Sequence, residues 1–201
     1  MKNFEEKQKL LIVVDMVNGF LKGGPLHDKK INKITPIIDK EIQKFLKYEY
    51  DVIFLQDAHV GFPEEFNNFP PHCLKGSWEA ETIDEFKKYL PNVTLIEKNT
   101  INGLEEAPLN NFLNQHENKY NEIRIVGDCT PYCIKTLADS LKKMYRYNKL
   151  RITVPSDATY TFGTCAKSAD IEHEKALQEM QKNGVGIIKL QNNHDEINER
   201  I

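Results

Sequence analysis

The chain has 201 residues, a length that suits one domain with a substantial hydrophobic core. Its 27 basic and 30 acidic residues nearly balance, which argues against a nucleic-acid-binding surface and favours a small-molecule partner. The N-terminal segment MKNFEEKQKL is polar and charged, and the apolar run after it stops at Asp15. Because that run is too short for a signal core or a membrane span, we expect a cytoplasmic protein that does not contact membranes.

Short apolar runs alternate with helical patterns along the chain. The predicted strands are 10–16, 51–57, 93–99, 122–128, 150–158 and 185–190, and the predicted helices are 31–48, 80–90, 107–117, 133–147 and 165–183. The strand runs are continuously apolar, which is typical of strands buried on both faces of a parallel sheet. The pattern predicts a single-domain, three-layer α/β/α fold with a mainly parallel, Rossmann-like sheet of six strands. Its core spans about 9–190, and a polar tail, 191–201, is expected to be frayed.

A long irregular stretch, 59–77, interrupts this alternation. It contains two glycines and several prolines and shows no helical or strand period. A loop of this length is uncommon in a compact domain unless it has a function.

Reactive residues follow the predicted strands. Asp15, Asp57 and Lys98 end the first three, and Cys133 comes after the fourth. Ligands of parallel sheets bind beyond the carboxyl ends of the strands, so these side chains predict a nucleophilic site. The helix N-terminus and Lys98 would stabilise the Cys133 thiolate, and Asp15 would act as general base. The alternative is an ordinary Asp15–Lys98 ion pair, with Cys133 only packing.

Cys129 lies four residues before Cys133, a spacing at which a disulfide is conceivable. Pro131 between them suits a first helical turn and places Cys129 in the preceding turn, which makes a redox pair the less favoured interpretation. The backbone amides of Cys129 and Cys133 could instead stabilise an oxyanion. We expect the other two cysteines, Cys73 and Cys165, to be small buried hydrophobes.

A second group of polar residues indicates a metal site. Asp57 and His59 are two residues apart and so point to the same side of an extended chain, while Glu65 and His72 in the long loop could complete a shell. This mixture of nitrogen and oxygen ligands suits zinc, iron or manganese. The alternative is that both histidines are ordinary surface residues.

Taken in order, five motifs resemble those of the isochorismatase-like cysteine hydrolases, and within them the nicotinamidases. The motifs are VVDMVNGFLKGGPL, DAH, FPPHC, EKNT and GDCTPYC, and the resemblance covers about residues 9–190. It implies the isochorismatase-like fold, a homo-oligomer, and hydrolysis of nicotinamide to nicotinate and ammonia through a cysteine thioester, in NAD salvage. Alternatives are another small amide or ureido substrate, or a binding protein that no longer turns over.

The resemblance also implies roles for individual residues. Asp15, Lys98 and Cys133 correspond to a catalytic triad. A divalent metal ion, with zinc as the first choice and iron or manganese as alternatives, would be bound by Asp57, His59, Glu65 and His72. Glu64 competes with its neighbour for the fourth ligand position.

Further expectations concern the substrate pocket and the turn before the nucleophile. Phe20 and Phe69 match positions where aromatic residues wall the substrate ring, although both could simply pack in the core, and Tyr132 is expected to line the pocket. The resemblance implies a cis peptide bond between Asp128 and Cys129. Pro131 departs from the family pattern, because it stands where an aspartate is common, so any contact made by that aspartate is lost.

Overall fold

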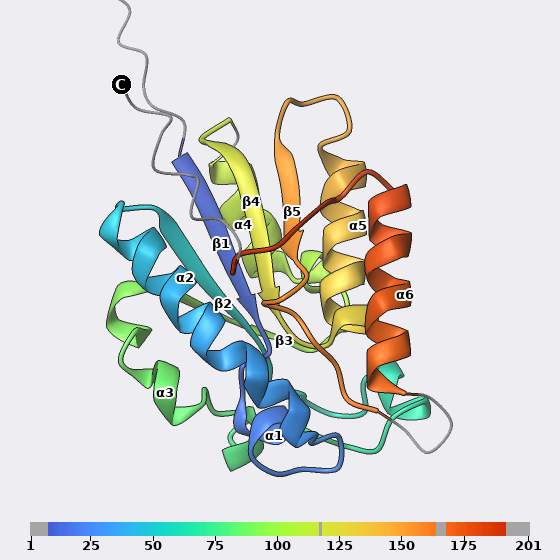
Figure 1. The fold of residues 1–201 in the computed structure, drawn as a ribbon. Helices are drawn as coiled ribbons and strands as arrows, with labels where there is room; N and C mark the ends of the chain where they lie inside the picture. Colours follow the sequence, from blue (N-terminus) through green and yellow to red (C-terminus); the bar gives the residue numbers. More distant parts are fainter. Residues whose placement is uncertain (1–7, 117, 164–167, 192–201) are drawn as a thin grey trace, which may run out of the picture.

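The computed structural model describes residues 8–116, 118–163 and 168–191. Within these residues, the strands form one six-stranded sheet in the order β3-β2-β1-β4-β5-β6, and all neighbouring pairs are parallel (Figure 1). The strands are β1 (Gln8–Val14), β2 (Asp51–Asp57), β3 (Thr94–Lys98), β4 (Tyr120–Gly127), β5 (Arg151–Pro155) and β6 (Gly186–Ile188). The predicted parallel α/β sheet is therefore confirmed.

Helices cover both faces of the sheet and complete three layers (Figure 1). They are α1 (Asn18–Leu21), α2 (Thr35–Lys47), α3 (Asp84–Lys87), α4 (Ala107–Gln115), α5 (Lys135–Met144) and α6 (Ala169–Lys182). Short 3₁₀ helices lie in the connections: η1 (Lys29–Ile34), η2 (Glu64–Asn67), η3 (Trp78–Ala80), η4 (Leu90–Asn92) and η5 (Gly103–Glu105). A single π-helical turn, η6 (Thr130–Ile134), precedes α5.

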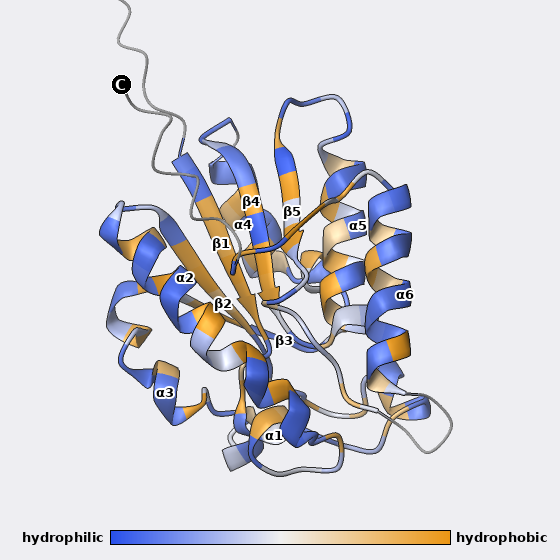
Figure 2. Ribbon diagram, viewed as in Figure 1, coloured by the Kyte–Doolittle hydropathy of each residue, from blue (hydrophilic) through white to orange (hydrophobic). Residues whose placement is uncertain are grey.

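The core consists of two apolar clusters, one on each face of the sheet. Leu11 and Val13 of β1 pack in the cluster that contains the apolar side of α2, while Ile12 and Val14 pack in the cluster that contains α4 and α5. The central strands are apolar along most of their length in Figure 2, as burial on both faces requires. Burial of these strands drives formation of the sheet.

Two predicted elements differ from the structure. The segment 80–90 is not one helix, because Thr82 forms an antiparallel bridge with Val17 and Ile83 donates a backbone hydrogen bond to the carbonyl of Met16 (3.1 Å). These contacts require extended backbone, so helical structure is limited to η3, α3 and η4. The strand predicted at 150–158 ends at Pro155, where the chain turns.

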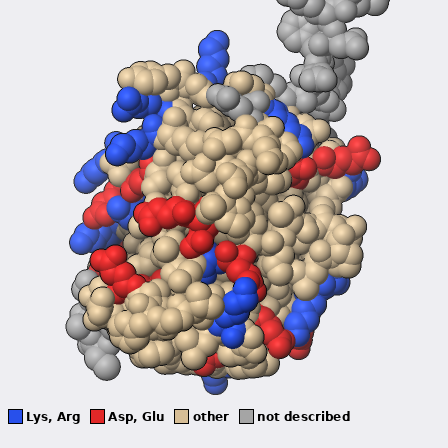
Figure 3. Space-filling view, turned by 180° about the vertical axis from the view of Figure 1, so that it is seen from behind, with Lys and Arg blue, Asp and Glu red and all other residues tan. Residues whose placement is uncertain are grey.

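Some expectations fall outside the described residues. These are the ends of two predicted helices at Glu117 and 165–167, the interpretation of Cys165, and nearly all of the predicted polar tail, 192–201. Among the helices that are described, none is both long enough and apolar enough to cross a membrane. The face seen in Figure 3 carries acidic and basic side chains side by side, in line with the balanced composition.

The chain adds strands on one side of β1 up to β3 and then on the other side from β4 onward. The strand order therefore reverses between β1 and β4, and the carboxyl ends of these two strands lie at this switch point. Ligands of such sheets bind in the crevice at this switch point. Asp15 follows β1 there, with φ of 51°, and its amide donates to the carbonyl of Leu55 at 2.9 Å. A left-handed conformation is unfavourable for an aspartate in isolation and is held here by the surrounding strands.

Gly127 at the end of β4 gives a direct test of this close strand packing. Its φ is +115°, and a Cβ there would lie 2.0 Å from the carbonyl oxygen of Val14. We expect Gly127→Ala to lower the free energy of unfolding by about 3 kcal/mol or more, because backbone of β1 would have to move. Gly61→Ala is the matched control, since Gly61 also has positive φ (+68°) but no atom within 4 Å of a Cβ. Equal losses in urea unfolding of the two variants would contradict the argument.

Candidate functional site

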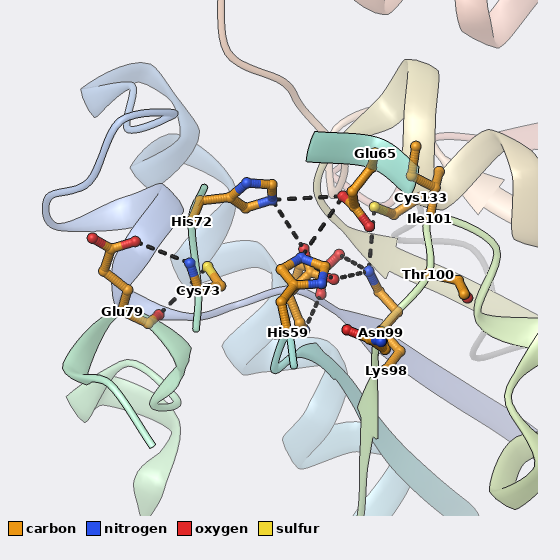
Figure 4. Close-up of polar contacts among 12 residues, drawn as sticks. His59, Glu65, His72, Cys73, Glu79, Lys98, Asn99, Thr100, Ile101 and Cys133 are labelled. Atoms are coloured by element: carbon orange, nitrogen blue, oxygen red, sulfur yellow. Dashed lines mark hydrogen bonds and ion pairs between the residues drawn. The ribbon is translucent and has the colours of Figure 1, made fainter. Parts of the chain in front are cut away.

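A buried lysine lies at the centre of the reactive residues. The Nζ of Lys98 forms ion pairs with Asp57 and with Asp15 (3.0 Å) and lies 3.5 Å from the Sγ of Cys133 (Figure 4). Asp15 in turn accepts a hydrogen bond from the amide of Asp57 at 2.8 Å. All four side chains are buried, so these interactions are little screened by water.

The fold explains why residues so distant in sequence meet. Asp57 and Lys98 are paired in register at the ends of β2 and β3, and Asp15 follows the adjacent β1. Cys133 belongs to η6, which follows β4 on the other side of β1. The structure thus brings together the strand-end residues that the sequence singled out.

The two carboxyl groups beside Lys98 differ in proton affinity. Burial, together with the negative charge of Asp57 and against the opposing effect of Lys98, raises the pKa of Asp15 to about 7. Burial alone would also raise the pKa of Asp57, but the charge of Lys98 and the nearby imidazoles of His59 and His72 hold it well below its usual value. One carboxyl can therefore exchange a proton near neutrality, while the other remains charged.

Cys133 is buried, and its surroundings favour the thiol over the thiolate. Burial raises the pKa of Cys133 well above its usual value, and the charge of Asp15 adds to this effect, whereas Lys98 acts in the opposite direction. Lys98 acts in the direction that the sequence predicted, but desolvation opposes the thiolate, so the role of Asp15 as the base that takes the thiol proton stays a prediction. The thiol needs a base, and its Sγ and a carboxylate oxygen of Asp15 lie within 4.8 Å of each other.

The turn before Cys133 contains the cis peptide bond implied by the resemblance, between Asp128 and Cys129. Thr130 anchors this turn. Its amide donates to the carbonyl of Tyr160 (2.9 Å), and its hydroxyl lies 2.9 Å from the Nδ1 of the buried His173 on α6. These contacts hold the turn although Pro131 cannot make an aspartate's contacts.

The cysteines of this turn face different parts of the core. Cys129 packs in the cluster on the α2 side and Cys133 in the cluster on the α5 side, and neither forms a disulfide. This arrangement disfavours the redox pair. Cys73 is fully buried, as expected for a small hydrophobe, and burial raises the pKa of its thiol.

The predicted metal ligands form one compact buried group. His59 Nε2 lies 3.5 Å from Asp57 Oδ1 and 3.7 Å from Glu65 Oε2, and His72 Nε2 lies 3.7 Å from Asp57 Oδ2 and 3.6 Å from Glu65 Oε2. The candidate ligand atoms all lie within 4.8 Å of one another. Figure 4 shows both imidazoles and the carboxylate of Glu65 converging on one point.

Several polar atoms of this group have no hydrogen-bond partner although they are buried. They are Asp57 Oδ2, Glu65 Oε1 and both ring nitrogens of His59. Buried polar atoms are normally satisfied, so these atoms fit a bound cation. The Nδ1 of His72 lies 2.9 Å from the carbonyl of Pro70, a contact that orients the ring and leaves Nε2 free to bind a metal ion. Glu65 is buried whereas Glu64 is exposed, which favours Glu65 as the fourth ligand.

Aromatic side chains surround these two groups. Phe20 contacts the ring of His72 edge-on, with centroids 5.5 Å apart. Phe69 and Tyr132 contact each other at 5.0 Å, and the ring of Phe162 stacks on Tyr132 at 5.8 Å. The predicted pocket residues thus lie beside the metal group and the nucleophile.

Phe162 and His173 are two residues of this neighbourhood that the sequence did not reveal. Phe162 lies in an irregular segment, and His173 looks like an ordinary position on an amphipathic helix. No spacing or motif marks either residue, because only the fold brings them to the nucleophile turn.

Comparisons with known proteins identify the family of the chain. The family model described as Isochorismatase domain matches residues 9–192. A curated relative from Mycobacterium tuberculosis named Nicotinamidase/pyrazinamidase is 25% identical over 195 residues, covering 90% of this chain and 98% of that protein.

Solved structures show the same fold. The pyrazinamidase of Pyrococcus horikoshii in complex with zinc has a TM-score of 0.73 at 26% identity, covering 91% of this chain and 99% of that one. The N-carbamoylsarcosine amidase of Thermoplasma acidophilum has a TM-score of 0.74 at 22% identity, covering 90% and 96%. The family match across nearly the whole chain shows that this protein belongs to the isochorismatase-like hydrolase family.

Proposed function

We propose that the protein hydrolyses nicotinamide to nicotinate and ammonia through a thioester on Cys133. The observation that carries this proposal is the position of Lys98 Nζ between Asp15 (3.0 Å) and Cys133 Sγ (3.5 Å). This arrangement brings together a nucleophile (Cys133), a base (Asp15) and a fixed positive charge (Lys98) in one buried site.

In the first half-reaction, Asp15 takes the proton of the Cys133 thiol while sulfur attacks the carboxamide carbon. The backbone amides of Cys129 and Cys133 would donate hydrogen bonds to the resulting oxyanion. Asp15 then returns the proton to the nitrogen, the carbon–nitrogen bond breaks, and ammonia leaves. The acyl group remains on sulfur as a thioester.

In the second half-reaction, water replaces ammonia. Asp15 takes a proton from the water as its oxygen attacks the thioester carbon, and the same two amides again stabilise the oxyanion. The carbon–sulfur bond breaks, the thiol recovers a proton, and nicotinate is released. Lys98 stays protonated throughout, because the charges of Asp15 and Asp57 raise its pKa against the effect of burial.

Four residues would hold a divalent cation next to this chemistry, zinc being the first choice: Asp57, His59, Glu65 and His72. A bound ion would supply a Lewis-acidic anchor for an aromatic nitrogen such as that of nicotinamide. Phe20, in contact with His72, and the Phe69–Tyr132 pair would position the ring.

The choice of nicotinamide rests on the metal group together with the named relative. An amide or ureido compound without an aromatic nitrogen is the second candidate, because a structurally similar protein is an N-carbamoylsarcosine amidase. Ammonia release from both kinds of substrate by the same preparation separates these candidates. A binding protein would release ammonia from neither. The product, nicotinate, would enter NAD salvage.

Replacing the nucleophile tests the thioester route. We expect Cys133→Ala to lower kcat by at least about 10⁴-fold, because no other group can form the acyl-enzyme. Cys129→Ala is the matched control: it retains the backbone amide and should keep most of the activity. The measurements are ammonia release from nicotinamide and mass spectrometry of acid-quenched enzyme for a nicotinoyl adduct. Substantial turnover by Cys133→Ala would refute the assignment.

The metal group has a test that is independent of activity. We expect the purified protein to contain about one divalent ion per chain, measured by elemental mass spectrometry, and Glu65→Ala to lose most of it because a ligand is removed. Glu64→Ala is the control, since Glu64 is an exposed neighbour and should leave the metal content unchanged. Equal metal content in the two variants would show that Glu65 is not a ligand.

A further inference from the structure

Asp128 is a buried acid that the proposed mechanism does not use. It lies between β4 and the nucleophile turn, and its side chain is completely inaccessible to solvent (0% exposed). Neither Oδ1 nor Oδ2 has a hydrogen-bond partner. Its amide, by contrast, is tied to the carbonyl of Val14 at 3.1 Å, so the backbone of this residue is held firmly against β1.

The surroundings of Asp128 are those of the candidate site. Its carboxyl is close enough to Asp15, Asp57 and Lys98 for their charges to change its pKa. Asp128 is joined by the cis peptide bond to Cys129, whose amide we place in the oxyanion hole. It does not belong to the group of four candidate metal ligands. Asp128 is thus a separate polar group within the same site.

An unpartnered buried carboxyl destabilises a folded protein, since it has lost its hydrogen bonds to water. Such a group needs an explanation in terms of something that completes it. Burial raises the pKa of Asp128 well above its usual value, and the charges of Asp15 and Asp57 add to the effect. In either protonation state, a carboxyl group offers at least one acceptor oxygen.

We propose that Asp128 is a specificity-determining residue, whose carboxyl oxygen accepts a hydrogen bond from the N–H of the substrate's scissile amide. This inference rests on the proposed amide hydrolysis and adds to it a reason for choosing amides that carry an N–H. The site would distinguish an amide from a carbonyl compound without an N–H, because only the amide completes the buried carboxyl. It would also hold the leaving nitrogen while Asp15 delivers its proton.

The experiment compares Asp128→Ala, which removes the carboxyl, with Asp128→Asn, which has nearly the same shape and retains an acceptor oxygen. For ammonia release from nicotinamide, we expect Asp128→Ala to lower kcat/KM by about tenfold or more, and Asp128→Asn to stay within about threefold of the parent. Pyridine-3-carbaldehyde, which has the same ring and a carbonyl but no N–H, should inhibit the parent and Asp128→Asn equally. Its inhibition constant for Asp128→Ala, measured on the residual activity, should change by less than about threefold.

Thermal unfolding of the same variants tests whether the role of Asp128 is purely structural. Because the carboxyl has no partner in the folded protein, the midpoint of Asp128→Ala should equal or exceed that of the parent. A lower midpoint, or parallel losses of nicotinamide turnover and aldehyde inhibition, would overturn the inference. Failure of the parent to release ammonia from any small primary amide would instead overturn the proposed function, and the inference with it.

Discussion

The site is organised around the Lys98 ammonium, which is buried among Asp15, Asp57 and the sulfur of Cys133. The carboxylates of Asp15 and Asp57 both contact this ammonium and repel each other. Without a cation between them, burial and this repulsion would disfavour the ionised form of each. Removing one partner from such a buried charge group costs about 3–5 kcal/mol, since the remaining charges are left uncompensated. Lys98 therefore holds the strand ends together and lowers the pKa of both acids against the effect of burial.

Asp57 joins the nucleophilic group to the candidate metal group. The carboxylate of Asp57 contacts the ammonium of Lys98 and the imidazoles of His59 and His72. The positions of these three side chains therefore depend on Asp57. A change in one half of the site would be transmitted to the other through this carboxylate. Precise placement of both halves is what a reaction between an anchored ring and a fixed sulfur requires.

The site also contains features that reduce stability. Asp15 has a left-handed backbone, Asp128 and His59 have polar atoms without partners, and Gly127 allows backbone contact that no side chain would permit. The remainder of the molecule compensates through strands that are buried on both faces and two continuous apolar clusters. Such local violations of good packing are typical of functional sites, where ligands complete what the folded chain leaves open.

Short apolar runs alone located the six strands and the parallel sheet. The signal is strongest in the inner strands β1, β2, β4 and β5, which are buried on both faces, whereas the edge strands β3 and β6 are partly exposed. The strand-end rule likewise identified Asp15, Asp57, Lys98 and Cys133. The sequence could not show that burial raises the pKa of Cys133 in its π-helical turn, that 80–90 is broken by a bridge to Val17, or that the carboxyl of Asp128 has no hydrogen-bond partner. Desolvation, long-range hydrogen bonding and the satisfaction of polar atoms depend on which residues surround a group in space, and only the tertiary structure determines those neighbours.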